Sequence, residues 1–211
     1  MSASALVRPA GFRHVVVATG HVTDAQDRAT ARFPEHGVRA VERVIGELFA
    51  HWQLDARDLV ICGGARGADL VSARCARERG ATPWLLLASA PETFEQTSVA
   101  GADPSWIEQF WTMVQRAPSW VLERDSRFGG RQDVFAAANE WMFETATTQA
   151  GGSPVRLVAV WDGAPAAGAG GTAHMVEVAR AGGAEVVVVD PLSGRAAADG
   201  SSADGTSADR T

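Results

Sequence analysis

The chain has 211 residues, of which 46% are hydrophobic and 21% charged, and its formal net charge is −6. This composition is typical of one globular domain with a sizeable core, and the net acidity argues against a general nucleic-acid binder, which normally has a basic face. All 19 basic residues are arginines, which excludes mechanisms that need a lysine, such as Schiff-base chemistry or a Walker-type phosphate loop.

The N-terminal residues lack the apolar segment of a signal peptide, and no run approaches the ~18 apolar residues of a membrane span. We therefore expect a cytoplasmic protein with no membrane partner. Cys62 and Cys75 lie in a predicted strand and a predicted helix, and neither has metal-ligand spacing. Both are expected to be buried small hydrophobes, and no metal or cofactor is expected.

Residues 13–21 form a β-branched run that ends in Thr19-Gly20, which predicts a buried strand meeting its turn. The stretch 21–34 is too polar and aperiodic for a helix, yet it leaves the strand end where ligands collect in open α/β sheets. It is interpreted as a binding loop that begins at His21. A surface connection with solvated side chains is the alternative.

The central segment 59–69 is an apolar run that stops in a glycine-rich turn and restarts as a helix over 68–79. The backbone N–H groups after Gly63 are expected to point outward and form an anion site, to which Arg66 adds a planar guanidinium. Asp69 in the first helical turn is explained equally well by the helix dipole and by ligand contact. A tight turn with one solvated arginine is the alternative for the whole segment.

Apolar spacing predicts further helices at 38–52, 92–116 and 134–147, and further strands at 83–88, 119–124, 155–163 and 185–190. A polar Gly-Gly loop is expected at 128–132. Asn139 interrupts the apolar positions of its helix, and its amide is expected to bond either a ligand or a neighbouring loop carbonyl.

A second glycine-rich turn follows the strand that ends at Asp162-Gly163. It contains Gly170-Gly171-Thr172 and leads into a helix over 173–181. A second helix N-terminus can then face the same crevice, with Thr172 placed to cap the helix or to bond an anion.

Alternating strands and helices predict an α/β fold with a doubly wound, mainly parallel sheet in a Rossmann-like three-layer sandwich. Residues 1–12 are interpreted as an N-terminal extension and 13–191 as the domain. Residues 192–211 are interpreted as a disordered tail, because from Ser193 they contain no aromatic or β-branched apolar side chain to offset the cost of ordering.

The segment 63–69 together with Gly170-Gly171-Thr172 resembles the paired glycine motifs of the SLOG superfamily of Rossmann-like domains. That group includes the cytokinin-activating phosphoribohydrolases (LOG), the DNA-processing protein DprA, and nucleotide-sensing domains of bacterial defence and signalling proteins. Three further segments, 19–21, 32–34 and 161–172, resemble its sensor-like branch, and the likeness covers most of residues 13–191.

The resemblance implies a nucleotide or nucleotide-derived ligand at the carboxyl ends of the strands. The phosphates are expected on Gly63, Gly64, Arg66, Gly67, Gly170, Gly171 and Thr172. Ribose or base is expected among Thr19, Gly20, His21, Asp162 and Asn139. Ala65, Asp69 and Gly163 complete the expected binding set.

Catalysis is a second expectation from the resemblance, because the phosphoribohydrolases use a glutamate shortly after their second Gly-Thr together with an arginine. Here Glu177 is displaced by two or three positions along the helix but can still reach the site, and Glu177, Asp162 or Asp69 could serve together with Arg66. A sensor is favoured over a LOG-like phosphoribohydrolase, since an acidic group beside phosphate also holds ribose hydroxyls. The expected partners are a nucleotide-like small molecule and an effector protein, and a homodimer is left open. A protein-interaction module would leave the two glycine turns unexplained.

Overall fold

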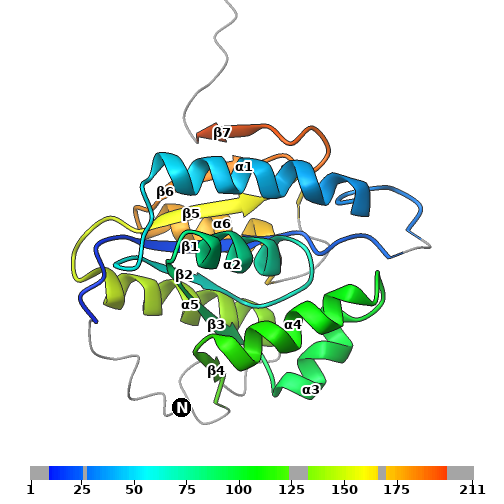
Figure 1. The fold of residues 1–211 in the computed structure, drawn as a ribbon, viewed down its shortest axis with the longest axis horizontal. Coiled ribbons are helices and arrows are strands. Elements are labelled where there is room, and N and C mark those ends of the chain that lie inside the picture. The colour runs from blue at the N-terminus through cyan, green and yellow to red at the C-terminus, as the bar shows by residue number, and fades with distance from the viewer. Residues whose placement is uncertain (1–9, 26–27, 124–132, 166–169, 199–211) are drawn as a thin grey trace, which may run out of the picture.

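A single seven-stranded sheet organises the molecule in the computed structural model (Figure 1). The structure describes residues 10–25, 28–123, 133–165 and 170–198. The strand order is β4-β3-β2-β1-β5-β6-β7, and every neighbouring pair is parallel except β6 with β7. The strands are β1 (Val15–Gly20), β2 (Leu59–Cys62), β3 (Thr82–Leu87), β4 (Ser119–Val121), β5 (Arg156–Val160), β6 (Glu185–Val189) and β7 (Ala196–Ala198).

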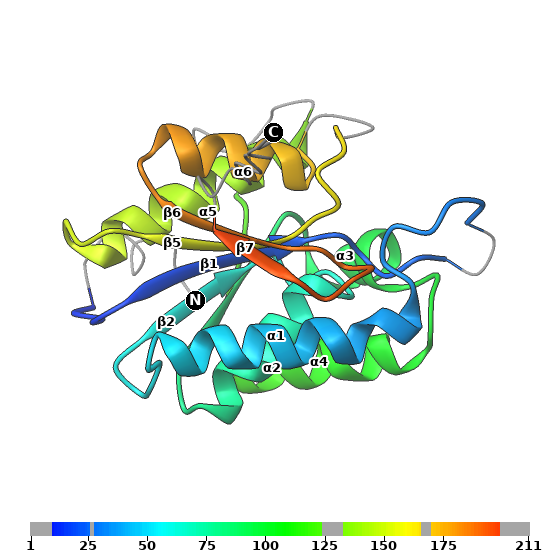
Figure 2. The same ribbon diagram turned by 90° about the horizontal axis from the view of Figure 1, so that it is seen from above.

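Helices cover both faces of the sheet, with α1, α2 and α4 on one side and α5 and α6 on the other (Figure 2). The helical segments are η2 (Glu35–Gly37), α1 (Val38–His51), α2 (Ala68–Glu78), α3 (Pro91–Phe94), η3 (Glu95–Val99), α4 (Ser105–Arg116), α5 (Val134–Ala150) and α6 (Thr172–Ala181). The predicted three-layer α/β fold with a mainly parallel sheet is therefore confirmed.

Strand β1 shows why the sheet is buried on both faces. Val16 belongs to the core cluster that contains Ile45 of α1, whereas Val17 belongs to the cluster that contains Val176 of α6. Successive side chains of a strand point to opposite faces, so a strand covered on both sides reads as a continuous apolar run. Cys62 and Cys75 are buried and free, as expected of small hydrophobes.

The predicted single helix over 92–116 is divided in the structure. A short α3 continues as the π-helix η3, the chain leaves helical geometry at Ala100, and α4 starts after Pro104. Pro104 is the N-cap of α4 and Asp103 accepts the N–H of Ser105 through its side chain at 2.9 Å, so these residues set the new helix start.

The predicted disorder from residue 192 is wrong for the described part of that segment. Asp190 accepts the backbone N–H of Leu192 at 2.7 Å in a turn, and β7 then pairs antiparallel with β6. Backbone hydrogen bonds to an open sheet edge need no apolar side chain, which is why composition did not reveal this strand. Residues 199–211 lie outside the described residues, as do 1–9 of the expected extension and the expected loop at 128–132.

The strand order places a topological switch point between β1 and β5. The chain moves from β1 through β2 and β3 to β4 on one side, then returns to β5 on the other side of β1. In open α/β sheets the ligand crevice lies outside the carboxyl ends of the strands at such a point. Gly20 pairs with Val160 at that end of the two strands, so the loops after β1 and β5 leave side by side. In the described part of the chain, no helix has the length and apolarity needed to cross a membrane.

Candidate ligand-binding site

A cavity of about 420 Å³ lies at the switch point. It has a polar side built from the two glycine turns and the loop after β1, and an apolar side contributed mainly by β3, α3 and α5. The polar side includes Thr19, His21, Arg32, Arg66, Asp69, Asn139 and Thr172, and the apolar side includes Leu86, Phe94, Phe135, Ala138 and Met142. A volume of this size falls within the range of small-molecule sites, which are mostly apolar with a few placed polar groups.

The first glycine turn is filled by a side chain of its own helix. The carboxylate of Asp69 accepts the backbone N–H of Ala65 at 3.2 Å, and the N–H groups of Gly63 and Gly64 also donate to it. Asp69 is only 7% exposed, and burial raises the pKa of its carboxyl to about 7, against the opposing effect of these three donors. The N–H groups that were expected to point outward thus already have an acceptor.

Gly67 shows how closely the loop after β1 packs on this turn. Its φ is +85°, and a Cβ atom there would lie 2.8 Å from the backbone nitrogen of Thr23 and 2.9 Å from the carbonyl oxygen of His21. The N–H of Ala68, at the start of α2, donates to the same carbonyl at 3.3 Å. The glycine is therefore required by chain packing, and the α2 N-terminus is closed by protein groups.

Arg66 is held by backbone carbonyls. Its Nε donates to Thr23 at 3.1 Å and its Nη1 to Ala100 at 2.5 Å, while its backbone N–H donates to Ser98 at 3.1 Å. The residue is 9% exposed, and burial lowers its pKa from the ordinary value. Arg66 ties the loop after β1 to the segment after η3, and this positions the cavity wall that contains Thr97 and Ser98.

The second glycine turn has a different arrangement. The buried amide of Asn139 donates through Nδ2 to the carbonyls of Gly170 at 2.9 Å and Gly171 at 3.3 Å. These bonds turn the carbonyls toward α5. Within the described residues, the N–H groups of Thr172 and Ala173 at the start of α6 have no acceptor. Such groups carry the partial positive charge that attracts an anion.

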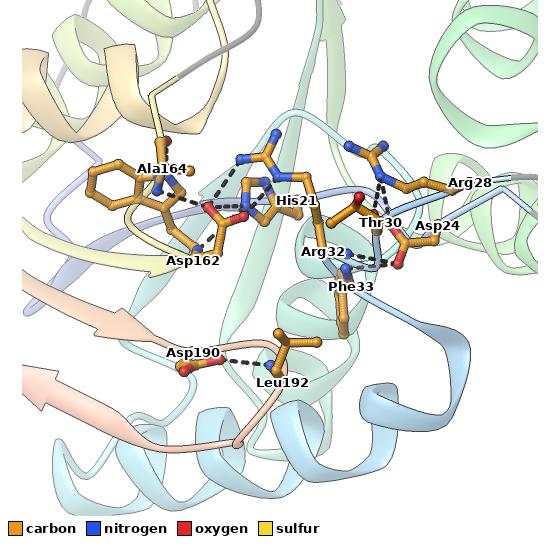
Figure 3. A network of polar contacts seen from close by, with 11 residues as sticks. His21, Asp24, Arg28, Thr30, Arg32, Phe33, Asp162, Ala164, Asp190 and Leu192 are labelled. Carbon is orange, nitrogen blue, oxygen red and sulfur yellow. Dashed lines mark hydrogen bonds and ion pairs between the residues drawn. The ribbon is translucent and has the colours of Figure 1, made fainter.

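A cluster of three charged or polar side chains spans the β1–β5 crevice (Figure 3). Arg32 donates to the Asp162 carboxylate through Nε at 2.7 Å and Nη2 at 3.0 Å, and Nε2 of His21 lies 3.0 Å from Oδ1 of Asp162. Arg32 lowers the pKa of the Asp162 carboxyl well below its usual range, and burial lowers the pKa of His21. The Arg32–Asp162–His21 cluster therefore joins the loop after β1 to the loop after β5 at neutral pH.

The structure brings together most of the predicted site residues. The predicted residues in the cavity wall are Thr19, Gly20, His21, Gly63, Ala65, Arg66, Asp69, Asn139, Gly170, Gly171 and Thr172. The predicted residues outside it are Gly64, Gly67, Asp162, Gly163 and Glu177. Glu177 is exposed on α6, so the carboxylate expected from the phosphoribohydrolase pattern is not part of the cavity. Asp162 lies behind the cavity wall and holds two wall residues, Arg32 and His21, in place.

Sequence reasoning missed several wall residues. Arg32 lies in the loop that was interpreted as a binding loop, and the available signal was its place in segment 32–34, which carries part of the resemblance. Thr97 and Ser98 gave no signal, because the π-helix that turns them toward the cavity interrupts a segment with ordinary helical spacing. Phe135, in the first turn of α5, is also a wall residue and remains 43% exposed.

Comparisons with known proteins found similarity in structure but not in sequence. No protein-family model matches the chain. A comparison with curated proteins likewise found no match. DNA processing protein A (DprA) from Streptococcus pneumoniae is similar in structure, with a TM-score of 0.49 and 17% identity over 86% of this chain and 53% of that one. A structural-genomics target, TM1055, has a TM-score of 0.44 and 18% identity over 82% of this chain and 72% of that one.

The chain thus spans about half the length of DprA. These similarities concern the fold only.

Proposed function

We propose that the cavity binds a nucleotide or nucleotide-derived ligand and that the protein acts as a sensor domain. The observation that carries this proposal is the open N-terminus of α6 beside a half-apolar cavity of about 420 Å³. The first supplies donors for a phosphate, and the second accommodates a sugar and a base.

The phosphate is placed at the second glycine turn. Thr172 and Ala173 both line the cavity, and their N–H groups have no acceptor among the described residues. The first turn is a poorer phosphate site, because the Asp69 carboxylate occupies its donors and would repel a second anion when ionised.

The remaining wall suits the rest of a nucleotide. Phe94, Phe135 and Met142 offer apolar and aromatic surface against which a base can pack. The hydroxyl of Thr19 and the amide oxygen of Asn139, whose NH2 group already holds the second turn, are near the places where ribose hydroxyls need partners.

Binding without turnover is favoured by the place of Glu177. The phosphoribohydrolase pattern needs a carboxylate in the cavity after the second Gly-Thr, and Glu177 instead faces solvent on α6. The purified protein should therefore be stabilised by one class of compound among nucleoside monophosphates, cyclic nucleotides, NAD and ADP-ribose, without release of free base. Thermal unfolding and chromatography of the same samples check both points.

A paired substitution tests the phosphate position. Ala173→Asp adds a carboxylate in the first turn of α6, where the helix dipole tolerates it but a phosphate does not. We expect at least a tenfold weaker affinity of Ala173→Asp than of Ala173→Asn for phosphate-bearing ligands by calorimetry, because the two side chains are nearly isosteric and differ in charge. Absence of any nucleotide binding by the wild-type protein overturns the proposed function, and equal affinities of the two variants overturn the phosphate position.

One observation favours a second candidate, a LOG-like phosphoribohydrolase. Asp69 is the carboxylate among the described cavity-wall residues, and its pKa of about 7 suits proton transfer at neutral pH. Hydrolysis of an N-glycosidic bond adds water to the anomeric carbon and releases the base with a proton, and a carboxylate can activate that water. Base release that disappears in Asp69→Asn identifies this activity, and ligand binding without base release excludes it.

A further inference from the structure

Among the residues that the structure describes, Arg32 and Arg66 are the arginines of the cavity wall, and their guanidinium groups have different partners. The guanidinium of Arg66 donates hydrogen bonds to the backbone carbonyls of Thr23 and Ala100. Arg32 donates from one edge of its guanidinium, Nε and Nη2, to the carboxylate of Asp162. A guanidinium has five N–H donors, and no described residue accepts a hydrogen bond from Nη1 of Arg32.

The backbone around Arg32 is fixed before any ligand arrives (Figure 3). The Asp24 carboxylate accepts the backbone N–H of Arg32 at 2.9 Å and that of Phe33 at 3.1 Å. Phe33 is fully buried in the core cluster on the α1 side of the sheet. The loop therefore presents the Arg32 side chain from an anchored position, which reduces the ordering cost of binding.

The side chain is also oriented. Asp162 binds it with the parallel, two-bond geometry that suits guanidinium and carboxylate, and His21 and the backbone N–H of Ala164 hold the carboxylate at 3.0 Å each. Arg32 keeps 22% of its side chain exposed and is part of the cavity wall. The edge that faces away from Asp162 is thus available to a group in the cavity.

We propose that Arg32 is the residue that selects phosphate-bearing ligands, binding the phosphate from the β1 side of the crevice while the α6 N-terminus binds it from the β5 side. Asp162 and His21 are positioning residues for this guanidinium. The inference rests on the proposed nucleotide-binding function and adds the specificity of the site: a phosphomonoester is bound in preference to the uncharged nucleoside.

The test compares the four ribonucleoside 5′-monophosphates with their four nucleosides by calorimetry, in wild type, Arg32→Gln, Arg32→Lys and Arg28→Gln. Arg32→Gln should weaken monophosphate binding at least tenfold and change nucleoside binding less than twofold. Arg32→Lys keeps the charge but lacks the planar guanidinium, which can bind Asp162 with one edge and phosphate with the other. We therefore expect a loss of monophosphate affinity smaller than that of Arg32→Gln. Arg28 belongs to the same loop but is not a wall residue, and Arg28→Gln should behave as wild type.

The outcomes separate the two proposals. If the wild-type protein binds no nucleotide or nucleoside, the proposed function fails and the role of Arg32 fails with it. If wild type binds monophosphates and both Arg32 variants keep the wild-type preference over nucleosides, only the role of Arg32 is overturned. Thermal unfolding of each variant is measured alongside, and an equal loss of monophosphate and nucleoside binding in folded Arg32→Lys also counts against phosphate selection.

Discussion

The two glycine turns of this protein look alike in sequence and differ in what their backbone donors contact. After β2, the N–H groups of Gly63, Gly64 and Ala65 point to the carboxylate of Asp69. After β5, the carbonyls of Gly170 and Gly171 are held by Asn139, and the N–H groups that follow have no acceptor among the described residues. The donors of the first turn are thus satisfied within the fold, whereas those that follow the second turn are the ones to which we assign the phosphate in the proposed function.

The difference arises from which polar group each turn satisfies internally. A buried donor or acceptor without a partner costs about 1–3 kcal/mol. In each turn a side chain therefore forms hydrogen bonds with the backbone groups that would otherwise be buried without a partner. In the first turn a carboxylate satisfies donors, and in the second an amide satisfies acceptors. Glycine-rich turns before helices are therefore not equivalent anion sites, and the side chain that faces each one decides its role.

The largest effect is expected from a methyl group in the second turn. In Gly170→Ala the Cβ atom would lie 2.3 Å from the backbone nitrogen of Ala136 in α5, at a residue whose φ is +86°. Strain at a positive φ and displacement of a helix start together should lower the free energy of unfolding by about 2–4 kcal/mol. Urea denaturation measures this loss.

Gly163→Ala is the matched control, because Gly163 also has a positive φ but no atom within 4 Å of the added Cβ. It should lose about 1 kcal/mol, from strain alone. Equal losses in the two variants would show that the second turn is not packed against α5 as the structure has it.

The first turn is tested by its pH dependence. The carboxyl of Asp69 has a pKa of about 7 in the fold, above the 3.8 of an unperturbed aspartate. Because the folded state binds this proton more tightly, the contribution to stability is complete below about pH 4 and is lost as the pH rises through about 7. Wild type should therefore lose stability from pH 5 to pH 8, and Asp69→Asn should lack that part of the loss.

Asp103→Asn serves as the control in the same denaturation series. Asp103 is an exposed carboxylate that also accepts a backbone N–H, and its pKa is lowered. Its contribution to stability is present above the unfolded pKa and falls only in acid, so this variant should differ from wild type by the same amount at pH 5 and pH 8. An Asp69→Asn profile parallel to wild type would mean that Asp69 is not the buried acceptor of the first turn.

The fold was predictable because its signals are local. Apolar runs such as 59–62 and helical spacing such as 38–51 depend on residues close in the chain, and the structure confirms these elements with small shifts of their ends. The short edge strand β7 was missed, since it is made by main-chain pairing of three alanines with β6.

The place of the candidate site in the fold was predictable from the sequence, but the contacts of its residues were not. Glycines and polar residues after strands indicated the edge of the sheet at which the cavity lies, but the contacts of these residues depend on partners far away in the chain. Arg66 bonds a carbonyl 34 residues ahead, and Arg32 bonds a carboxylate 130 residues ahead. Glu177 is exposed on α6 rather than in the cavity wall, because helix phase, and not distance along the chain, decides which way a side chain faces.

A smaller effect on stability than that of Gly170→Ala, and the most specific effect on binding, is expected from Asn139→Ala. The substitution removes the donor to the carbonyls of Gly170 and Gly171, which should cost about 1–2 kcal/mol in the free energy of unfolding. Without those bonds the turn is less ordered, so nucleotide binding should weaken several-fold because the ligand must then order the donors of α6.

Thr147→Ala is the comparison for Asn139→Ala, because it removes a side-chain hydrogen bond from the same helix, to the carbonyl of Phe143 at 2.9 Å. Because Thr147 is exposed and alanine is the better helix former, the substitution should change stability by less than about 1 kcal/mol and leave ligand affinity unchanged. The contrast separates loss of α5 stability from loss of order in the second turn. If both variants bind nucleotide like wild type, the anion site does not depend on the orientation of this turn, and the functional difference between the two glycine turns disappears.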